Sequence, residues 1–89
     1  MTATNVAVER QVTGRVGNAE GTLAKELAEL QERYADVEIG SYPYFRRGDF
    51  GVTLVLRATD RERLAAATEE LKVLVRRLGG DPQEGLSEG

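Results

Sequence analysis

The sequence predicts a small α+β domain in which two helices lie on one face of a three-stranded antiparallel sheet. Three observations predict this class: apolar residues with a period of two near the start, two stretches of helical spacing, and an aliphatic run at residues 51–58. With 89 residues, of which 40% are hydrophobic, the chain has the size of one domain. We expect that domain to cover residues 1–80, in the order β-α-β-β-α, and residues 81–89 to form a disordered tail.

The first strand is expected at residues 6–12, where apolar and polar residues alternate and only Arg10 breaks the pattern. The stretch that follows, "GRVGNAEG" at residues 14–21, contains too much glycine to continue the strand. Its first four residues also match the G-x-x-G loop with which KH domains clamp a nucleic-acid backbone. Two interpretations stay open: a flexible connection, which we favour because the KH loop joins two helices, and a backbone clamp.

The first helix is expected to begin at Glu20 or Thr22 and to end at Tyr34. Leu23, Leu27, Leu30 and Tyr34 recur there at intervals of three or four, which places them on one face of a helix. The charged residues of the same stretch fall on the other side, so the pattern indicates a surface helix with one buried face.

A β-hairpin is expected after this helix. Val37 and Ile39 begin a second strand, and "GVTLVLRA" at residues 51–58 forms a third. The intervening "RRGD" has turn composition, and Gly48 can adopt a positive φ. Because the third strand is apolar on both sides, we expect it to be the central strand.

The second helix is expected to begin at a capping box formed by Thr59 and Glu62, whose side chains can satisfy two free backbone N–H groups. Gly79 and Gly80 end the helix, and Pro82 prevents its continuation. Between these signals the apolar residues form a single stripe: Leu64, Ala67, Leu71, Leu74, Val75 and Leu78.

A right-handed crossover of the first β-α-β unit, with the return strand of the hairpin inserted between its two strands, gives the sheet order 1-3-2. Both helices then cover one face of the sheet and leave the other face open. The residues expected on this open face are Glu9, Gln11, Thr13, Glu38, Thr53, Val55 and Arg57.

Composition excludes several functions. The chain has no Cys and no His, which excludes the common zinc, iron–sulfur, haem and thiol sites, so a metal would have to bind through carboxylates alone. Asp, Glu, Lys, Ser, Thr and Tyr remain as possible catalytic groups, but they form no recognisable constellation, and we expect no metal site, no cofactor and no catalytic residue. A net charge of −3 argues against nucleic acid as the main partner. The first residues do not have the layout of a signal peptide, and no apolar run is long enough to cross a membrane. We therefore expect a cytoplasmic chain that does not bind membranes.

Four of the five aromatic residues lie in "GSYPYFRRGDFG" at residues 40–51. The rings of a hairpin can complete a core or an interface, or they can stack on nucleotides next to arginines. We favour packing and keep ligand stacking as the alternative. The candidate surface for an interaction or a ligand comprises Tyr42, Pro43, Tyr44, Phe45, Arg46, Arg47, Val55 and Arg57.

The run from "EGTLAKELAEL" through "VEIGSYP" and "TLVLRATD" to "TEEL" resembles a segment of the competence- and damage-inducible CinA family. In that family the segment follows the nucleotide/molybdopterin-binding (MoaB-like) domain, and it has a counterpart in eukaryotic FAD synthases. The likeness covers about residues 8–78, and "VEIGSYP" is its most specific part. The resemblance implies a KH-type α/β domain. The family's nucleotide pyrophosphatase and nicotinamide-nucleotide amidohydrolase activities depend on domains outside this stretch, so no catalytic residue carries over.

The expected function is that of a non-catalytic accessory domain, which supports dimerisation or docks onto the neighbouring nucleotide-binding domain. Its expected partner is accordingly that domain or a second copy of the chain. The alternative is a nucleotide or nucleic-acid binding module that uses the "GRVG" loop together with Arg46 and Arg47 of the hairpin. Whether the chain is a fragment or a free-standing domain stays open.

Overall fold

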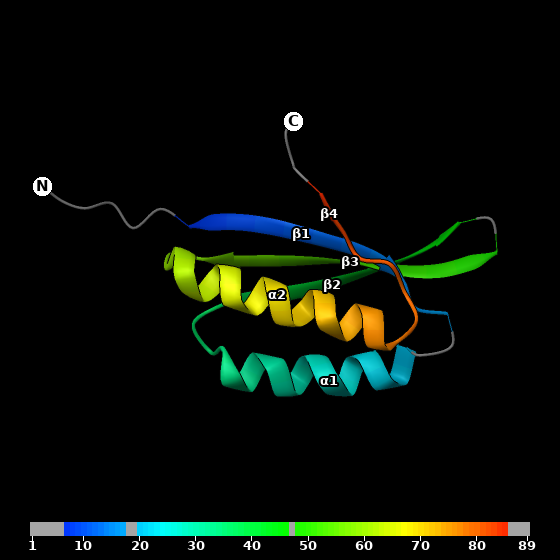
Figure 1. The fold of residues 1–89 in the computed structure, drawn as a ribbon, viewed down its shortest axis with the longest axis horizontal. Helices are drawn as coiled ribbons and strands as arrows, with labels where there is room; N and C mark the ends of the chain where they lie inside the picture. The colour runs from blue at the N-terminus through cyan, green and yellow to red at the C-terminus, as the bar shows by residue number, and fades with distance from the viewer. Residues whose placement is uncertain (1–6, 18–19, 47, 86–89) are drawn as a thin grey trace, which may run out of the picture.

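The computed structural model describes residues 7–17, 20–46 and 48–85, which form a two-layer α+β sandwich. Figure 1 shows the two helices side by side on one face of a sheet. The elements in chain order are β1 (Val8–Arg15), α1 (Glu20–Arg33), β2 (Glu38–Arg46), β3 (Asp49–Ala58), α2 (Arg61–Arg77) and β4 (Gln83–Gly85).

The sheet has four strands in the order β2-β3-β1-β4, and every neighbouring pair is antiparallel. This is the ferredoxin-like β-α-β-β-α-β arrangement, in which β3 lies between the two strands of the first β-α-β unit. The expected order 1-3-2 is confirmed for β1, β3 and β2. The expectation of a three-stranded sheet is wrong, because β4 adds a fourth strand to the edge of β1.

The fourth strand lies in the segment for which the sequence predicted a disordered tail. Gln83–Gly85 pairs with residues 11–13 of β1. Arg10 Nε donates to the Glu84 carboxylate at 2.6 Å, and Lys72 Nζ of α2 lies 2.7 Å from the other oxygen of that carboxylate. These charge contacts hold a strand that has almost no apolar residues. Residues 86–89 lie outside the described part of the chain.

The hydrophobic core lies between the helices and the inner face of the sheet. Val52, Leu54 and Leu56 of β3 point toward the helices and are almost completely buried. Their buried partners come from β1, α1, α2 and the neighbouring loops, and the partly buried Ile39 of β2 packs against them, so the small domain has one continuous core. The other buried apolar residues are Val12, Val16, Leu23, Leu30, Tyr34, Val37, Ala58, Leu64, Ala67, Leu71, Leu74 and Val75.

The second helix begins one residue later than the sequence predicted. Its N-cap is Asp60, whose carboxylate accepts hydrogen bonds from the backbone N–H groups of Glu62 and Arg63 at 2.9 and 3.1 Å. The predicted capping box on Thr59 and Glu62 is therefore wrong. Thr59 and Asp60 are both suitable N-cap residues, but the Asp60 carboxylate, which lies next to the positive end of the helix, is the stronger acceptor.

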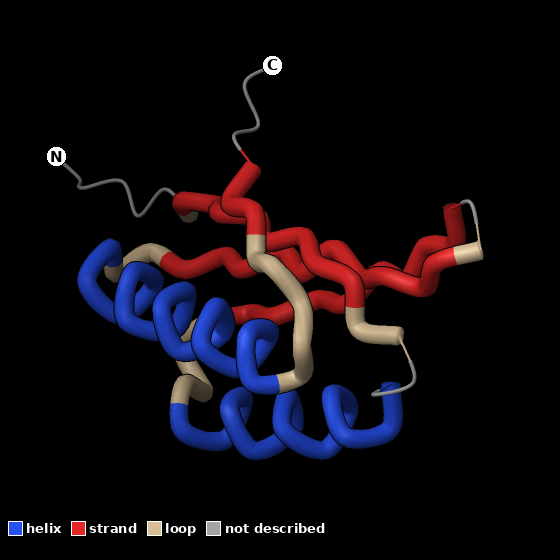
Figure 2. Tube along the Cα trace, turned by 45° about the vertical axis from the view of Figure 1, so that its right-hand side comes forward, coloured by secondary structure: helices blue, strands red, loops and turns tan. Residues whose placement is uncertain are grey.

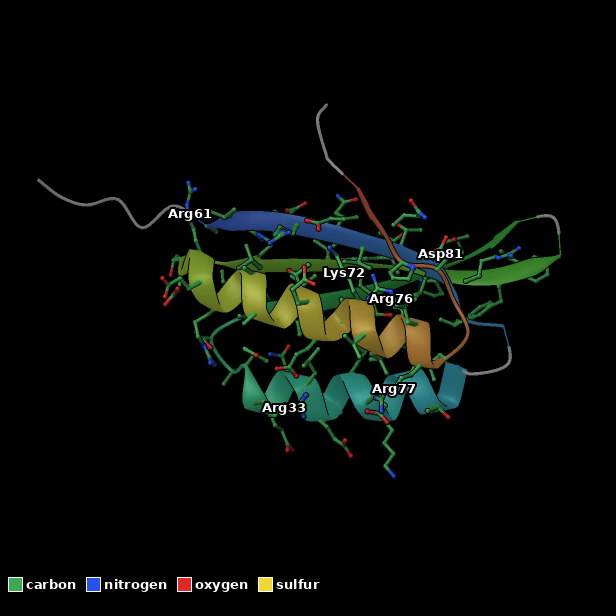
Figure 3. The ribbon with its side chains drawn as sticks, in the orientation of Figure 1. Arg33, Arg61, Lys72, Arg76, Arg77 and Asp81 are labelled. Atoms are coloured by element: carbon green, nitrogen blue, oxygen red, sulfur yellow. The ribbon has the colours of Figure 1, made fainter. Side chains whose placement is uncertain are left out.

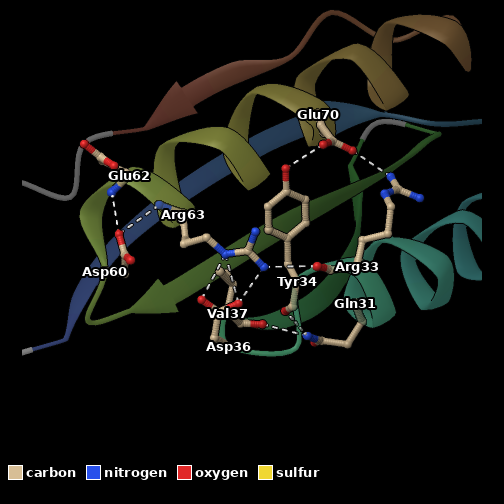
Figure 4. Close-up of polar contacts among 9 residues, drawn as sticks. All are labelled: Gln31, Arg33, Tyr34, Asp36, Val37, Asp60, Glu62, Arg63 and Glu70. Carbon is tan, nitrogen blue, oxygen red and sulfur yellow. Dashed lines mark hydrogen bonds and ion pairs between the residues drawn. The ribbon is translucent and has the colours of Figure 1, made fainter.

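Polar contacts join the C-terminal end of α1 to the start and the middle of α2, as Figure 4 shows. Arg63 binds both carboxylate oxygens of Asp36, and its guanidinium lies 4.5 Å from the ring centroid of Tyr34. The Tyr34 hydroxyl donates to Glu70 at 2.6 Å. The hydrogen bond from Tyr34 and the one from Arg33 keep the pKa of Glu70 below its usual value. These contacts fix how α1 and α2 lie against each other.

The hairpin between β2 and β3 extends past the ends of the helices, and Figure 2 shows its tip without a helix beneath it. The pairing of the strands continues to Arg46 and Asp49. Gly48 has φ 81°, so the positive φ expected for this turn residue is confirmed. Neither α1 nor α2 combines the length and the apolar character that crossing a membrane requires.

Candidate interaction surface

The strand register defines a sheet face that points away from the helices. We call it the open face, and no helix covers it among residues 7–17, 20–46 and 48–85. Residues paired across neighbouring strands share a face, so every residue that the sequence predicted there is confirmed. Tyr42, Tyr44 and Arg15 belong to the same face. By register the face includes Glu9, Gln11, Thr13, Arg15, Glu38, Gly40, Tyr42, Tyr44, Gly51, Thr53, Val55 and Arg57, together with Gln83 and Gly85 of β4.

A row of charges crosses one end of the open face. Arg57 of β3 lies 3.9 Å from the Glu9 carboxylate of β1 and 3.7 Å from the Glu38 carboxylate of β2. All three side chains remain substantially exposed, so these pairs contribute little to stability. In the middle of the face the hydroxyl oxygens of Thr13 and Thr53 lie 3.4 Å apart, and Val55 is half-buried.

Two tyrosine rings of β2 lie low over glycines. A Cβ atom at Gly40 would be 3.1 Å from the Tyr42 hydroxyl oxygen, and one at Gly51 would collide with the Tyr44 ring. Both rings therefore lie against the backbone of the sheet rather than standing up from it. Tyr42 keeps 59% of its surface exposed. A glycine within a strand is a signal of close approach, so Gly40 and Gly51 could have pointed to these ring positions from the sequence, but they were not among the predicted site residues.

The remaining aromatic residues of the hairpin lie on its other face. Phe45 pairs with Phe50 on the side of the helices, and Phe45 is 71% exposed because the hairpin extends past them. Phe50 packs against the core. The structure therefore divides the predicted aromatic surface between two faces. The side chain of Arg46 and the whole of Arg47 lie outside the described residues.

Pro43 lies within β2, which is an edge strand of the sheet. Proline has no N–H group, so a strand added at this edge would lose a hydrogen bond at that position. Pro43 thus favours contacts through the faces of the hairpin over pairing at its edge.

The "GRVG" stretch does not form an open phosphate loop. Gly14 belongs to β1, and Val16 is buried in the core. The N–H groups of Val16 and Gly17 both donate to the carbonyl of Phe50, at 3.1 and 3.2 Å. Because these amides already have partners within the fold, the backbone clamp considered for this stretch has no structural support.

The helical side of the molecule carries paired charges around a shallow groove of about 270 Å³ between α1 and α2. Arg77 binds Glu26 at 3.2 Å and Arg33 binds Glu70 at 2.6 Å; Figure 3 labels both arginines. Within the described residues, no group of three acidic side chains is arranged to hold a metal ion.

Comparison with known proteins supplies a family. The profile of the family described as "FAD synthase, middle domain" matches residues 12–78. No curated protein matches the sequence significantly.

Several solved structures share the fold. The de novo designed protein Foldit4 is 21% identical, with a TM-score of 0.78 over 90% of this chain and 94% of that protein. The designed protein Ferredog-Diesel is 21% identical, with a TM-score of 0.57 over 97% of this chain and 90% of that protein. A C-terminal segment of the alpha subunit of aIF2 from Pyrococcus abyssi is also 21% identical, with a TM-score of 0.57.

The match to the aIF2 segment covers 93% of this chain but only 51% of that segment. At 21% identity these structures show a shared fold and nothing of function. The profile match is different in kind, because it is a match of sequence and covers most of the chain. The chain therefore belongs to the FAD synthase middle-domain family.

Proposed function

We propose that the chain is a non-catalytic accessory domain whose open face and hairpin dock onto a covalently neighbouring domain. The observation that carries this proposal is the open face itself, where Tyr42 is 59% exposed on a sheet face that no described helix covers. The family is described as a middle domain, and the resemblance to the CinA family proposes a nucleotide-binding domain as the neighbour. The KH-type relationship stays a prediction.

The composition of the open face suits protein binding. Tyrosine and arginine are enriched where protein interfaces gain most of their affinity, and Tyr42, Tyr44 and Arg57 lie on this face. The low position of the two rings over Gly40 and Gly51 keeps the face flat. A flat face allows another sheet or a helix to approach across its whole width.

The size of the face favours a tethered neighbour over a free partner. Three strands of about eight residues cover roughly 400 Å². A stable complex between separate proteins usually buries about 800 Å² of accessible surface per partner, which is a large demand on a face of this outline. A covalently linked domain needs a smaller interface, because its effective concentration reaches about the millimolar range.

The composition supports a non-catalytic role. Histidine and cysteine are absent from the sequence, and most described carboxylates make ion pairs or lie at the surface. The purified chain should therefore not accelerate hydrolysis of ADP-ribose or nicotinamide mononucleotide. Metal-dependent turnover that disappears on substitution of one Asp or Glu would refute this part of the proposal.

The docking surface can be tested in a fusion of this chain to a CinA-type nucleotide-binding domain. The amide resonances of the open face should differ between the fusion and the isolated chain. Val55→Lys and Tyr42→Ala should abolish these differences. Val73→Lys, at an exposed position on α2, should leave them unchanged and serves as the control.

Three outcomes would count against this proposal. Identical open-face resonances in the fusion and the isolated chain would show that no docking occurs. A concentration-dependent dimer that Val55→Lys disrupts would assign the face to a second copy instead. Submicromolar binding of single-stranded RNA that is lost in an Arg46→Ala, Arg47→Ala double variant would favour the nucleic-acid alternative.

A further inference from the structure

The two helices carry the same pattern of eight residues. Residues 26–33 of α1 read "ELAELQER", and residues 70–77 of α2 read "ELKVLVRR". Each stretch has a glutamate at its first position, leucines at the second and fifth, and an arginine at the eighth. Because seven residues make almost two helical turns, the glutamate and the arginine of each stretch lie on one face of their helix, about 10 Å apart.

Ion pairs across the groove between the helices arrange these four charges as a rectangle. Arg33 of α1 binds Glu70 of α2 at 2.6 Å, and Arg77 of α2 binds Glu26 of α1 at 3.2 Å. The helices therefore run antiparallel, and cation and anion alternate around the four corners. Figure 3 shows Arg33 and Arg77 at separate positions along the helices. We call these four side chains the charge rectangle.

The centre of the charge rectangle is apolar. Leu30 and Leu74 are buried beneath the groove, whose volume is about 270 Å³. Val73 lies midway along α2 between the two charges of that helix, lines the groove and is 51% exposed. Pockets for small molecules begin at about 300 Å³, so a groove of this volume suits an inserted side chain better than a small ligand.

We propose that the helical layer is a dimer interface for a second copy of this chain. The charge rectangle is complementary to itself: when a half-turn brings two copies face to face, every glutamate of one copy lies opposite an arginine of the other. This holds whether the axis runs along the groove or across it. The same patch thus serves both partners, as a two-fold interface requires. Val73 of each copy then packs against the partner's groove, and the charges fix the orientation.

The four charges can contact a partner without giving up their present pairs. The side chains of Arg33 and Arg77 are 57% and 60% exposed, and those of Glu70 and Glu26 are 41% and 33% exposed. A guanidinium carries five N–H donors, and a carboxylate offers about four acceptor positions. One bond within the domain therefore leaves capacity for another bond across the interface.

The size of the helical layer implies weak association. α1 and α2 have 14 and 17 residues, which makes them about 21 and 25 Å long, and two packed helices are about 20 Å wide. Interfaces of this extent are typical of transient complexes, so we expect a Kd of about 10⁻⁴ to 10⁻³ M. Salt should weaken the dimer, because the charges that orient it are exposed. The helical layer lies on the opposite side of the sheet from the open face, so the dimer does not depend on the proposed docking function.

The test reverses the charges in two complementary variants of the full chain. Arg33→Glu with Arg77→Glu makes all four corners acidic, and Glu26→Lys with Glu70→Lys makes all four basic. Analytical ultracentrifugation should show that each variant alone associates at least tenfold more weakly than the unaltered chain, and that an equimolar mixture of the two associates again. Variants that each associate like the unaltered chain, or a mixture that stays monomeric, would overturn the proposal.

Two lysine substitutions on opposite faces locate the dimer independently and decide the question if a charge-reversed variant fails to fold. Val73→Lys puts an ammonium group at the centre of the interface and should weaken association at least tenfold. Val55→Lys, on the open face, should leave it unchanged. Disruption by Val55→Lys alone would place the dimer on the open face and refute the proposal. An unaltered chain that stays monomeric at about 2 mM, above the expected Kd, would reject a second copy as the occupant.

Discussion

Neighbouring residues of one strand have opposite roles in this domain. Leu54 of β3 is completely buried and points toward the helices, whereas Val55, the next residue, lies half-buried on the open face. The period-two pattern of the sequence was sufficient to assign both positions. The pattern could not show that the Tyr42 ring lies over Gly40 and the Tyr44 ring over Gly51. The second of these contacts joins two strands, so it depends on their register.

Lysine substitutions at these two positions should separate folding from docking. Leu54→Lys buries an unpaired charge and should abolish the cooperative thermal transition, since the cost of several kcal/mol approaches the whole stability of a small domain. Val55→Lys can direct its ammonium to solvent and should change the stability by less than about 1 kcal/mol. Circular dichroism melts measure both. Equal destabilisation by the two substitutions would show that the open face is covered in solution.

Two glycine-to-alanine substitutions should change the stability of the domain in opposite directions. At Gly51 the new methyl group would collide with the Tyr44 ring, so the ring must move and stability should fall by about 1 to 3 kcal/mol. At Gly21 in α1 no atom lies within 4 Å of the added methyl group, and alanine should stabilise the domain by about 0.5 to 1 kcal/mol. Urea unfolding gives both values. A neutral Gly51→Ala would mean that Tyr44 does not rest on the backbone.

At the scale of elements, the sequence predicted the two helices and three of the four strands. Both helices, β1 and β3 repeat an apolar pattern over several turns or pleats, whereas β2 was predicted from Val37, Ile39 and the turn composition that follows them. The fourth strand has only three residues and no such pattern. Its contacts come from Arg10 and Lys72, and Arg10 is separated from Glu84 by 74 positions. The one signal in the sequence was Arg10 itself, a cation at an inward position of β1.

The start of α2 provides a direct comparison between the predicted cap and the observed one. Asp60→Ala removes the acceptor of two backbone hydrogen bonds and should cost about 1 kcal/mol. Thr59→Ala changes an exposed residue outside the cap and should cost no more than a few tenths of that. Thermal or urea unfolding of the two variants checks the assignment. The reverse order would restore the capping box on Thr59 and Glu62.

At the scale of the whole molecule, the stability that the Glu84 contacts contribute should be lost only in strong acid. The hydrogen bonds from Arg10 and Lys72 lower the pKa of Glu84 from 4.5 to about 2, so the folded state favours the charged carboxylate. Its contribution to stability is complete above the higher value and is lost as the pH falls through the lower one.

This dependence can be measured as the difference in Tm between the unaltered chain and Glu84→Gln. The difference should be constant well above pH 5, should shrink as the pH falls from about 5 to 2, and should vanish below pH 2, where Glu84 becomes protonated in the folded state as well. Comparing the two chains cancels the titration of the other carboxylates. A difference that persists undiminished at pH 2 would mean that the ion pairs do not hold β4.

The pairing of the first strand with the last one also determines how the domain can be joined to others. Gly85 lies opposite Gln11, three residues from the start of β1, so the described chain begins and ends within about 10 Å along the same edge. A polypeptide that enters the domain at Val8 and leaves it at Gly85 therefore leaves close to the point where it entered. Such a module can be inserted into a surface loop of a host protein without separating the two ends of that loop.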